Sequence, residues 1–314
     1  MKLTVLMAVR DTPPAMLRQA ILSIRSQTLR DFEFLILDDG SEQSETRAEL
    51  GRHAAADSRI RLERGPPRGL TRTLNRGLAF AAGELIARQD ADDWSEPDRL
   101  AQQAAFLARH PEIDLCGANA LTHRHDGRPL WPSRLPESPA SIRQALWKGN
   151  PFFHGSAVFR RESARRAGGY REEFPSAQDY DFFWRLSDAG GAANLPQPLY
   201  HYRYSPAAVS ACRATEQARV YRAAQLLAEA RRSGAAGDVA SALAQATREL
   251  ADAGPLRTAL RQIDHCLLAG DFAAAGRAYA GLLTAHPASR VAWGKLLRWA
   301  LFTAVPQARE RCFR

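Results

Sequence analysis

Apolar runs alternate with helix-forming stretches over roughly the first 120 residues, and this alternation limits the possible folds more than any other feature. Leu3–Val9 is a continuous apolar, β-branched run, as expected of a strand buried on both faces. Residues 14–28 then carry apolar side chains at helical spacing, and residues 32–37 form a second apolar run. Strands that alternate with helices at this spacing imply right-handed crossovers. The sequence therefore predicts an α/β fold with a mostly parallel sheet flanked by helices.

Polar side chains follow three of the predicted strands at the point where each strand ends. Arg10 follows the first, Asp38 and Asp39 follow the second, and an acidic group begins at Asp90 after the strand predicted over residues 84–88. In such a sheet, ligands bind beyond the carboxyl ends of the strands. An Asx turn at Asp38 and Asp39 would explain one of these loops but not all three. We therefore expect a binding site at this edge.

Three carboxylates lie within four residues at Asp90, Asp92 and Asp93. Like charges this close cost free energy unless a cation or a set of donors lies among them. Hard oxygen ligands at the end of a strand suit a Mg or Mn ion that is shared with substrate phosphates. The alternative is a solvated acidic turn, in which Ser95 caps a helix predicted over residues 95–110.

The next part of the chain gives fewer regular signals. Residues 119–150 include four prolines and are predicted to form a flexible loop on the acceptor side. Residues 151–159 indicate a strand that enters the site region. A helix begins near residue 178, and Asp179 in its first turn lies close to the positive helix end, which favours its ionised form.

Charge divides the 314-residue chain into two parts. Residues 1–210 carry 28 basic and 26 acidic side chains, whereas residues 211–314 carry 15 basic and 8 acidic side chains. We predict a first domain over residues 1–210 and a basic helical domain over residues 211–314. A basic tail favours an anionic partner such as lipid headgroups or nucleic acid, but a solvated arginine-rich helical face is an equal alternative.

The cysteines and the apolar runs indicate the compartment. Cys116, Cys212, Cys266 and Cys312 are widely scattered, which fits unpaired thiols in a reducing environment. Leu3–Val9 is too short for the core of a signal peptide, and no apolar run approaches the ~20 residues that a spanning helix needs. We expect a cytoplasmic protein.

The last predicted helix is amphipathic and basic. It places Trp293 and Trp299 on a segment that also carries Lys295, Arg298 and Arg309. This combination suits peripheral contact with an anionic membrane surface at the inner face of the cell membrane. The alternative is an ordinary helix that packs on the core of the C-terminal region.

Several short motifs occur in a specific order over residues 2–205. They are Ala8-Val9-Arg10-Asp11, Asp38-Asp39-Gly40-Ser41, Asp90-Ala91-Asp92-Asp93, His154-Gly155-Ser156, Gly168-Gly169-Tyr170, Asp179-Tyr180-Asp181 and His201-Tyr202-Arg203. In this order the chain resembles the family 2 glycosyltransferases of the GT-A fold. The resemblance covers about two thirds of the chain and implies an inverting enzyme that uses a nucleotide sugar.

The resemblance implies a nucleotide-sugar pocket at the first strands. Asp39 would form a hydrogen bond with the nucleotide base. Ala8, Arg10 and Arg72 would line the same pocket. The base contact can differ in detail, because this family usually carries Tyr-Asn where the chain has Arg10 and Asp11.

The resemblance also implies a metal site and a catalytic base. Asp90 and Asp92 would form the Asp-x-Asp motif that binds the sugar diphosphate. Asp92 or Asp93 would coordinate the divalent ion, Mn or Mg. Asp179 would take the proton from the acceptor hydroxyl, and a positioned carboxylate suits this task because a sugar hydroxyl is a poor nucleophile.

Three further residues are candidate contacts of the acceptor or the diphosphate. His154 is one of them, and a histidine packed beside Phe152 and Phe153 is its structural alternative. Trp184 and Arg185 share a helix with Asp179, where structural packing and pairing are the alternative for both.

We therefore predict that a sugar is transferred from a nucleotide sugar, with UDP as the nucleotide, to a hydroxyl of a glycan or lipid-linked acceptor. Surface polysaccharide or lipopolysaccharide synthesis would use such a reaction, and no nucleic acid partner is expected. One alternative is a catalytically silent binding or scaffold protein, because Gln178 stands where the family usually has an acid. Another is a sugar-phosphate nucleotidyltransferase, although the loop after the first strand lacks the glycine-rich basic sequence that holds a triphosphate.

Overall fold

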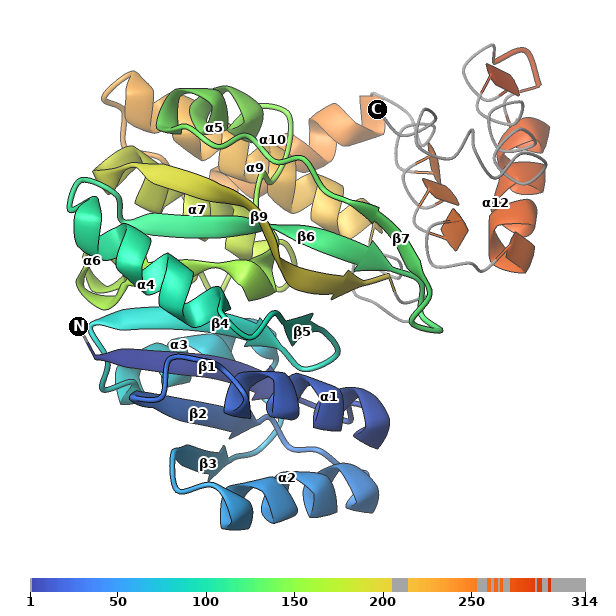
Figure 1. The fold of residues 1–314 in the computed structure, drawn as a ribbon. Coiled ribbons are helices and arrows are strands. Elements are labelled where there is room, and N and C mark those ends of the chain that lie inside the picture. The colour runs from blue at the N-terminus through green and yellow to red at the C-terminus, as the bar shows by residue number, and fades with distance from the viewer. Residues whose placement is uncertain are drawn as a thin grey trace. The chain divides into compact units, whose positions relative to one another are not determined.

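One curved sheet forms the centre of the fold (Figure 1). The computed structural model describes residues 2–204, 214–252, 259–260, 263–264, 266–267, 272–285, 287–289 and 293–294. The strands are β1 (Leu3–Val9), β2 (Phe32–Asp38), β3 (Ile60–Arg64), β4 (Leu85–Asp90), β5 (Trp94–Ser95), β6 (Leu115–His123), β7 (Pro129–Pro132), β8 (Val158–Arg160) and β9 (Ala192–Arg203). Along the sheet the order is β3-β2-β1-β4-β8-β6-β9-β5.

The first four strands form the parallel part of the sheet. β1 pairs in parallel with both β2 and β4, and β2 pairs in parallel with β3. Beyond β4 the sheet continues through antiparallel pairs, beginning with β8. The predicted α/β fold is thus confirmed, and the parallel pairing brings the ends of β1, β2 and β4 to one edge. Ala8 pairs there with Leu37 on one side and with Asp90 on the other.

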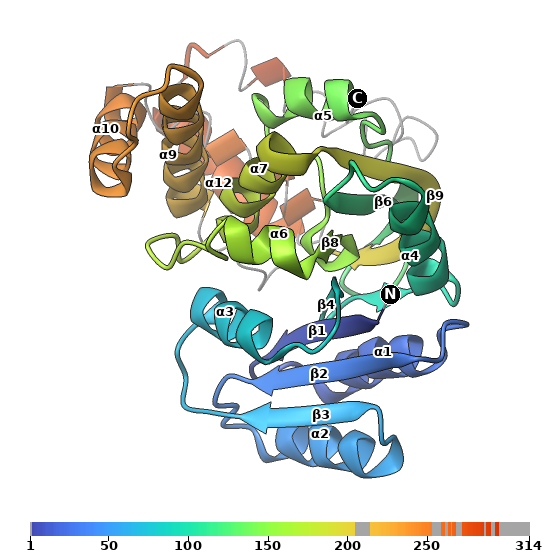
Figure 2. The same cartoon turned by 90° about the vertical axis from the view of Figure 1, so that its left-hand side faces the viewer.

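Helices cover both faces of the sheet (Figure 2). Those of the first 190 residues are α1 (Pro14–Arg25), α2 (Ser44–Ala56), α3 (Leu70–Phe80), α4 (Arg99–Arg109), α5 (Pro139–Leu146), α6 (Arg161–Arg166) and α7 (Gln178–Gly190), with the short 3-10 helix η1 (His154–Ser156) before β8. Because strand side chains alternate, Val5 and Met7 pack in one core with Leu17 and Ile21 of α1. Leu6 points to the other face, where a side chain at Gly77 of α3 would collide with it.

Three local predictions were wrong. The helix predicted from residue 95 begins at Arg99, because Trp94 and Ser95 instead form β5, which pairs with β9, and the Ser95 hydroxyl donates to Gln89. The strand predicted over residues 151–159 is mostly a loop with η1, and only its end forms β8. The predicted loop over residues 119–150 contains β7 and α5, and Ser138 and Ser141 close a capping box at the start of α5.

The chain divides into two compact units. The first comprises residues 1–122, 132–202 and 227–236, and the second comprises residues 123–131, 203–226 and 237–314. Helices α9 (Ala214–Arg232), α10 (Val239–Asp252) and α12 (Phe272–Ala285) follow β9. In the second unit, an ion pair between Arg222 and Glu249 joins α9 to α10. The domain boundary at residue 210 stays a prediction.

Most of the basic helix predicted at the end of the chain lies outside the described residues, which include only Trp293 and Gly294 of that segment. Among the helices that the structure does describe, none combines the length and apolar character needed to cross a membrane. The predicted peripheral contact with an anionic membrane is therefore still a prediction.

Candidate active site

A buried arginine supports the acidic end of β4. Arg88 has no exposed surface, and its guanidinium donates to Asp90 Oδ1 at 2.7 Å and to the carbonyl oxygen of Leu6. Asp90 is the last residue of β4 and is partly exposed, at 28% of its side chain. A buried cation needs an anionic partner and hydrogen bonds, and Asp90 supplies the charge. The ion pair therefore fixes the carboxylate of Asp90 at the edge of the sheet.

The same guanidinium contacts His154 of η1. Arg88 Nε and the Tyr170 hydroxyl lie 3.2 and 3.0 Å from His154 Nε2. Burial, together with the charge of Arg88, holds the pKa of His154 well below its usual value. The imidazole is therefore neutral, and its Nε2 accepts both hydrogen bonds because a guanidinium can only donate. His154 thus ties η1 and the Tyr170 turn to Arg88.

A tyrosine from β9 holds the acidic loop that follows β4. The Tyr200 hydroxyl donates to Asp93 Oδ2 at 3.0 Å and lies 3.3 Å from the backbone nitrogen of Asp90. Asp93 is buried, whereas Asp92 is half-buried. Gly155 must lack a side chain, because a Cβ there would overlap the Tyr200 hydroxyl and lie 2.8 Å from Asp90 Oδ2. Residues 90–93, η1 and β9 therefore meet at this point.

Asp179 lies in the first turn of α7, where the charges of Asp90 and Arg88 act on it. Asn150 Nδ2 donates to Asp179 Oδ2 at 2.7 Å. Burial, opposed in part by backbone hydrogen bonds, raises the pKa of Asp179 to about 6, and the negative charge of Asp90 adds to this effect. Ala177, directly before α7, has a left-handed backbone with φ of 51°, a strained conformation for a residue with a side chain. The turn that presents Asp179 is thus held in place against strain.

Asp39 lies in a cradle of donors at the start of α3. Its carboxylate accepts hydrogen bonds from the backbone nitrogens of Arg68 and Gly69 and from the Thr73 hydroxyl, at 2.7–2.9 Å. Asp39 is only 4% exposed. The neighbouring Asp38 accepts from the backbone nitrogen of Ser41, as expected for an Asx turn. Asp39 therefore fixes the loop over residues 65–69 to the end of β2.

Asp11 orders the loop beyond β1. It has a positive φ of 47°, and its Oδ1 accepts hydrogen bonds from the backbone nitrogens of Glu42 and Gln43, just before α2. A carboxylate at this place satisfies backbone donors near a helix start. Arg10, beside it, is exposed, and Ala8 is half-buried. The structure therefore gives Asp11, which differs from the usual family residue, a definite structural contact.

Arg72 pairs with the segment that leads to α7. Its Nε donates to Glu172 at 3.0 Å, and both side chains are exposed. One residue earlier, the Thr71 hydroxyl donates to the carbonyl oxygen of Phe174. The first turn of α3, which also contributes Thr73 to the cradle around Asp39, thus holds residues 172–174.

The two remaining candidates on α7 make extensive contacts within the protein. Arg185 donates to Asp181 and to the carbonyl oxygens of Ala167 and Gly169. Trp184 is 3% exposed and packs edge-on against Trp147, with ring centroids 4.7 Å apart. These contacts connect α7 to the turn before Tyr170 and to the end of α5.

The chain was compared with known proteins. Residues 4–168 match the family described as glycosyl transferase family 2. The chain belongs to glycosyl transferase family 2. The amylovoran biosynthesis glycosyltransferase AmsE of Erwinia amylovora is 31% identical over 60% of this chain and 71% of its own length. The O-antigen biosynthesis protein RfbC of Myxococcus xanthus is 35% identical over 64% of this chain, but this match spans only 16% of that protein.

Solved structures show the same fold at lower identity. TarS of S. aureus (residues 1–349, in complex with UDP) superposes with a TM-score of 0.55 and 16% identity, over 84% of this chain and 70% of that one. The mannosyltransferase PcManGT of Pyrobaculum calidifontis, in complex with GDP-Man and Mn2+, gives a TM-score of 0.57 and 21% identity, over 99% and 88%. The GT-A architecture of family 2 is thus shared by the chain.

The acidic loop of this family 2 member fits a metal that is shared with a substrate. No group of three His, Cys, Asp or Glu side chains within the described residues converges closely enough to hold an ion alone. Mg²⁺ in phosphate-transfer sites is bound through only one or two carboxylates, and substrate phosphates and water complete its shell. Asp90 and Asp92 offer hard oxygen donors of this kind at an accessible strand end. Asp93 is less accessible because it is buried against Tyr200.

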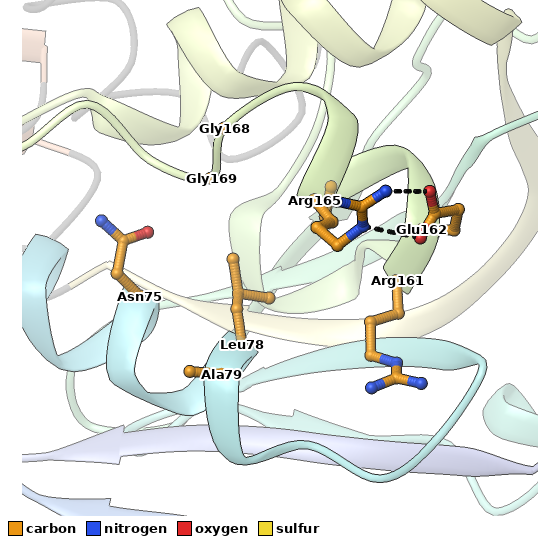
Figure 3. Close-up of a pocket in the computed structure, with 9 residues that line it drawn as sticks. Asn75, Leu78, Ala79, Arg161, Glu162, Arg165, Gly168 and Gly169 are labelled. Carbon is orange, nitrogen blue, oxygen red and sulfur yellow. Dashed lines mark hydrogen bonds and ion pairs between the residues drawn. The ribbon is translucent and has the colours of Figure 1, made fainter.

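A separate cavity of about 550 Å³ opens between α3 and α6 (Figure 3). Asn75, Leu78 and Ala79 line it from α3, and Arg161, Glu162 and Arg165 line it from α6. Glu162 pairs with Arg165 along α6, as the dashed lines show. None of the predicted site residues lines this cavity.

The structure also brings to the site residues that the sequence did not identify. Arg88, Asn150, Tyr170 and Tyr200 each contact a predicted site residue. Arg88 left a signal, because a charged residue that follows an apolar run within a predicted buried strand needs a partner. Asn150 and Tyr200 left none, because nothing in the sequence indicates which distant acid they meet.

Proposed function

We propose that the chain transfers a sugar from a nucleoside diphosphate sugar to a hydroxyl of a glycan or lipid-linked acceptor, with inversion at the anomeric carbon. Asp179 carries this proposal. Its pKa of about 6 leaves the carboxylate ionised at pH 7 yet more basic than an ordinary aspartate. Family membership and the placement of Asp90 and Asp179 near Arg88 support the same reading.

The proposed reaction is a single in-line displacement. The acceptor hydroxyl oxygen attacks the anomeric carbon while the bond to the diphosphate oxygen breaks, and Asp179 takes the hydroxyl proton late in the transition state. Asn150 orients Asp179 through the hydrogen bond to Oδ2. Attack from the face opposite the leaving group inverts the configuration.

On the donor side, Asp39 and its cradle would shape the pocket for the base together with Ala8, Arg10 and Arg72. Asp90 and Asp92 would bind the sugar diphosphate. Asp92 or Asp93 would coordinate a divalent ion, Mn or Mg, whose chemistry is to offset negative charge on the departing diphosphate. Arg88 would keep the carboxylate of Asp90 in place while the diphosphate departs. Contact of His154, Trp184 and Arg185 with the acceptor or the diphosphate stays a prediction.

Uracil is the proposed base, which the UDP complex of TarS supports, and guanine is the alternative that the GDP-Man complex of PcManGT offers. The relatives named for O-antigen and amylovoran biosynthesis support a place in surface polysaccharide synthesis. The basic C-terminal region would contribute peripheral contact with an anionic membrane. Sedimentation with acidic vesicles at low salt tests that contact, and failure to sediment would exclude it.

A thermal-shift screen of nucleoside diphosphates tests the donor side. A ligand that binds only the folded state at about 100 times its Kd stabilises the protein by about 2.7 kcal/mol. We expect UDP with Mn2+ to raise the Tm and EDTA to abolish the shift. If no nucleoside diphosphate raises the Tm, the proposed function is wrong.

Slow release of nucleoside diphosphate from a panel of nucleotide sugars then tests catalysis. Release that depends on added metal supports a transferase. Binding without any release, even in the presence of acceptor mixtures, would favour the catalytically silent alternative that Gln178 raises.

A further inference from the structure

Two aromatic side chains beside the proposed catalytic groups are only half-buried. Phe153 and Tyr202 lie with ring centroids 5.0 Å apart and ring planes tilted by 42°. We call them the aromatic pair. Their neighbours in sequence behave differently, because Phe152 is 6% exposed and packs edge-on against Phe183, and Tyr200 is fully buried. The aromatic pair is therefore not simply part of the core.

Phe153 belongs to the segment that contacts the proposed base. Three residues earlier, Asn150 donates to Asp179, and Asn150 Oδ1 accepts from the backbone nitrogen of Phe152. The next residue, His154, accepts from Arg88. In the sequence, Phe153 thus lies between Asn150, which contacts Asp179, and His154, which contacts Arg88.

Tyr202 reaches the same place from β9. Side chains two residues apart on a strand point to the same face, so Tyr202 lies on the face from which Tyr200 donates to Asp93. The intervening His201 points to the opposite face, where its ring stacks on Trp94 at 4.7 Å. The aromatic pair is consequently linked by short stretches of chain to both the base and the acidic loop.

We propose that the aromatic pair is a binding platform for the sugar ring of the acceptor, an inference that rests on the proposed function. A pyranose presents a face of C–H groups, which an aromatic ring can cover while the sugar hydroxyls remain free for polar partners. The acceptor hydroxyl must reach Asp179, whereas the donor is held through its diphosphate at Asp90–Asp93. A ring beside Asn150 and His154 therefore meets the acceptor sugar.

Replacement of either aromatic ring by leucine tests the platform in the full-length chain. Leucine keeps apolar volume but removes the flat ring, so we expect Phe153→Leu and Tyr202→Leu to weaken glycoside binding on the order of 3- to 10-fold each. The probes are the methyl glycosides of glucose, galactose, mannose, rhamnose and N-acetylglucosamine. Saturation-transfer NMR with UDP and Mg2+ present measures their dissociation constants.

Two controls separate recognition from packing. Phe80→Leu removes a 38%-exposed aromatic ring at the end of α3, and we expect it to leave glycoside binding unchanged. Phe153→Tyr and Tyr202→Phe keep a ring at each place and should restore wild-type dissociation constants. A purely structural role would lower the Tm of the leucine variants while glycoside binding stayed the same.

The outcomes are distinct from those of the donor test. Wild-type dissociation constants in both leucine variants, or no saturation transfer from the wild-type protein to any of the five glycosides, would overturn the platform. The UDP shift in Tm is measured on the same samples. If that shift is present and the glycoside effect is absent, the platform fails alone. If neither UDP nor any other nucleoside diphosphate shifts the Tm, the proposed function fails.

Discussion

Two aspartates of the candidate site have opposite surroundings. Asp39 accepts three hydrogen bonds within 2.9 Å from the start of α3 and the loop before it. Asp179 has one side-chain donor, Asn150, and burial raises its pKa to about 6. A carboxylate that is saturated by donors serves mainly to fix the backbone, whereas one that is buried with few donors retains affinity for a proton.

The contrast extends to the charges nearby. The cradle of Asp39 is made of neutral groups, namely two backbone nitrogens and a hydroxyl. Around Asp179 the fold gathers the charged groups Asp90 and Arg88. The proposed donor side is thus pre-organised by backbone donors, whereas charged groups surround the proposed catalytic carboxylate.

Substitution of Asp179 should produce the largest effect. Asp179→Asn keeps the shape of the side chain but removes the base, so we expect turnover to fall on the order of 100- to 10,000-fold. Release of nucleoside diphosphate in the presence of acceptor measures this. The matched control is Glu112→Gln, which changes an exposed acid that pairs with His110 and should leave turnover within about 2-fold. Near-normal turnover in Asp179→Asn would move the base elsewhere, and Asp181 would be the next residue to test.

Substitution of Asp39 tests the structural side of the comparison. Asp39→Ala leaves two backbone nitrogens and the Thr73 hydroxyl without their acceptor, so the free energy of unfolding should fall by about 1–3 kcal/mol. Urea denaturation measures the change. Asp31→Ala, at an exposed position, should change it by less than about 0.5 kcal/mol. Equal stability of the two variants would show that the cradle contributes little.

Urea denaturation of Asp179→Asn should show the opposite effect, a gain in the free energy of unfolding. Because the folded state raises the pKa of Asp179 from its usual 3.8 to about 6, burial of the ionised form destabilises the fold above pH 6. Asparagine removes that charge, so at pH 8 the variant should be more stable than wild type by about 1–2 kcal/mol. The gain should shrink as the pH falls from 6 toward 4. A loss of stability at pH 8 would contradict the distinction drawn between the two aspartates.

The smallest expected effect concerns the pH dependence of turnover. The rate should rise through a pH of about 6 as Asp179 ionises. Asn150→Ala removes a hydrogen bond to the ionised carboxylate, which raises the pKa of Asp179 further and moves this acid limb upward. A pH–rate profile with the donor at saturation measures the shift. An unchanged limb would mean that Asn150 does not act on the ionised base.

Much of the fold follows from local pattern. β1, β2 and α7 lie where apolar runs and helix starts predicted them, because the spacing of their apolar residues indicates both the element and its buried side. Prediction failed at Trp94–Ser95, where pairing with β9 outweighed a good helix-start sequence. It failed again at residues 151–159, where η1 lets Gly155 approach Tyr200 closely. Both errors depend on partners about 45–110 residues away, which local propensity cannot register.

The candidate site was predictable only in its acids. Asp39, Asp90 and Asp179 are marked by strand ends and a helix start, but nothing local says that Asp39 is saturated and Asp179 is not. That difference comes from the loop over residues 65–69 and from Asn150, which are set by tertiary structure. The roles of these acids in binding and catalysis stay predictions.

The contact between Tyr200 and Asp93 joins residues 107 positions apart. During synthesis on the ribosome, the acidic loop is made long before the strand that holds it. A growing chain therefore lacks the assembled centre until β9 has emerged and docked. A chain that ends before β9 lacks the Tyr200 hydroxyl that holds the acidic loop, because the last strand of the sheet is also the one that contacts Asp93.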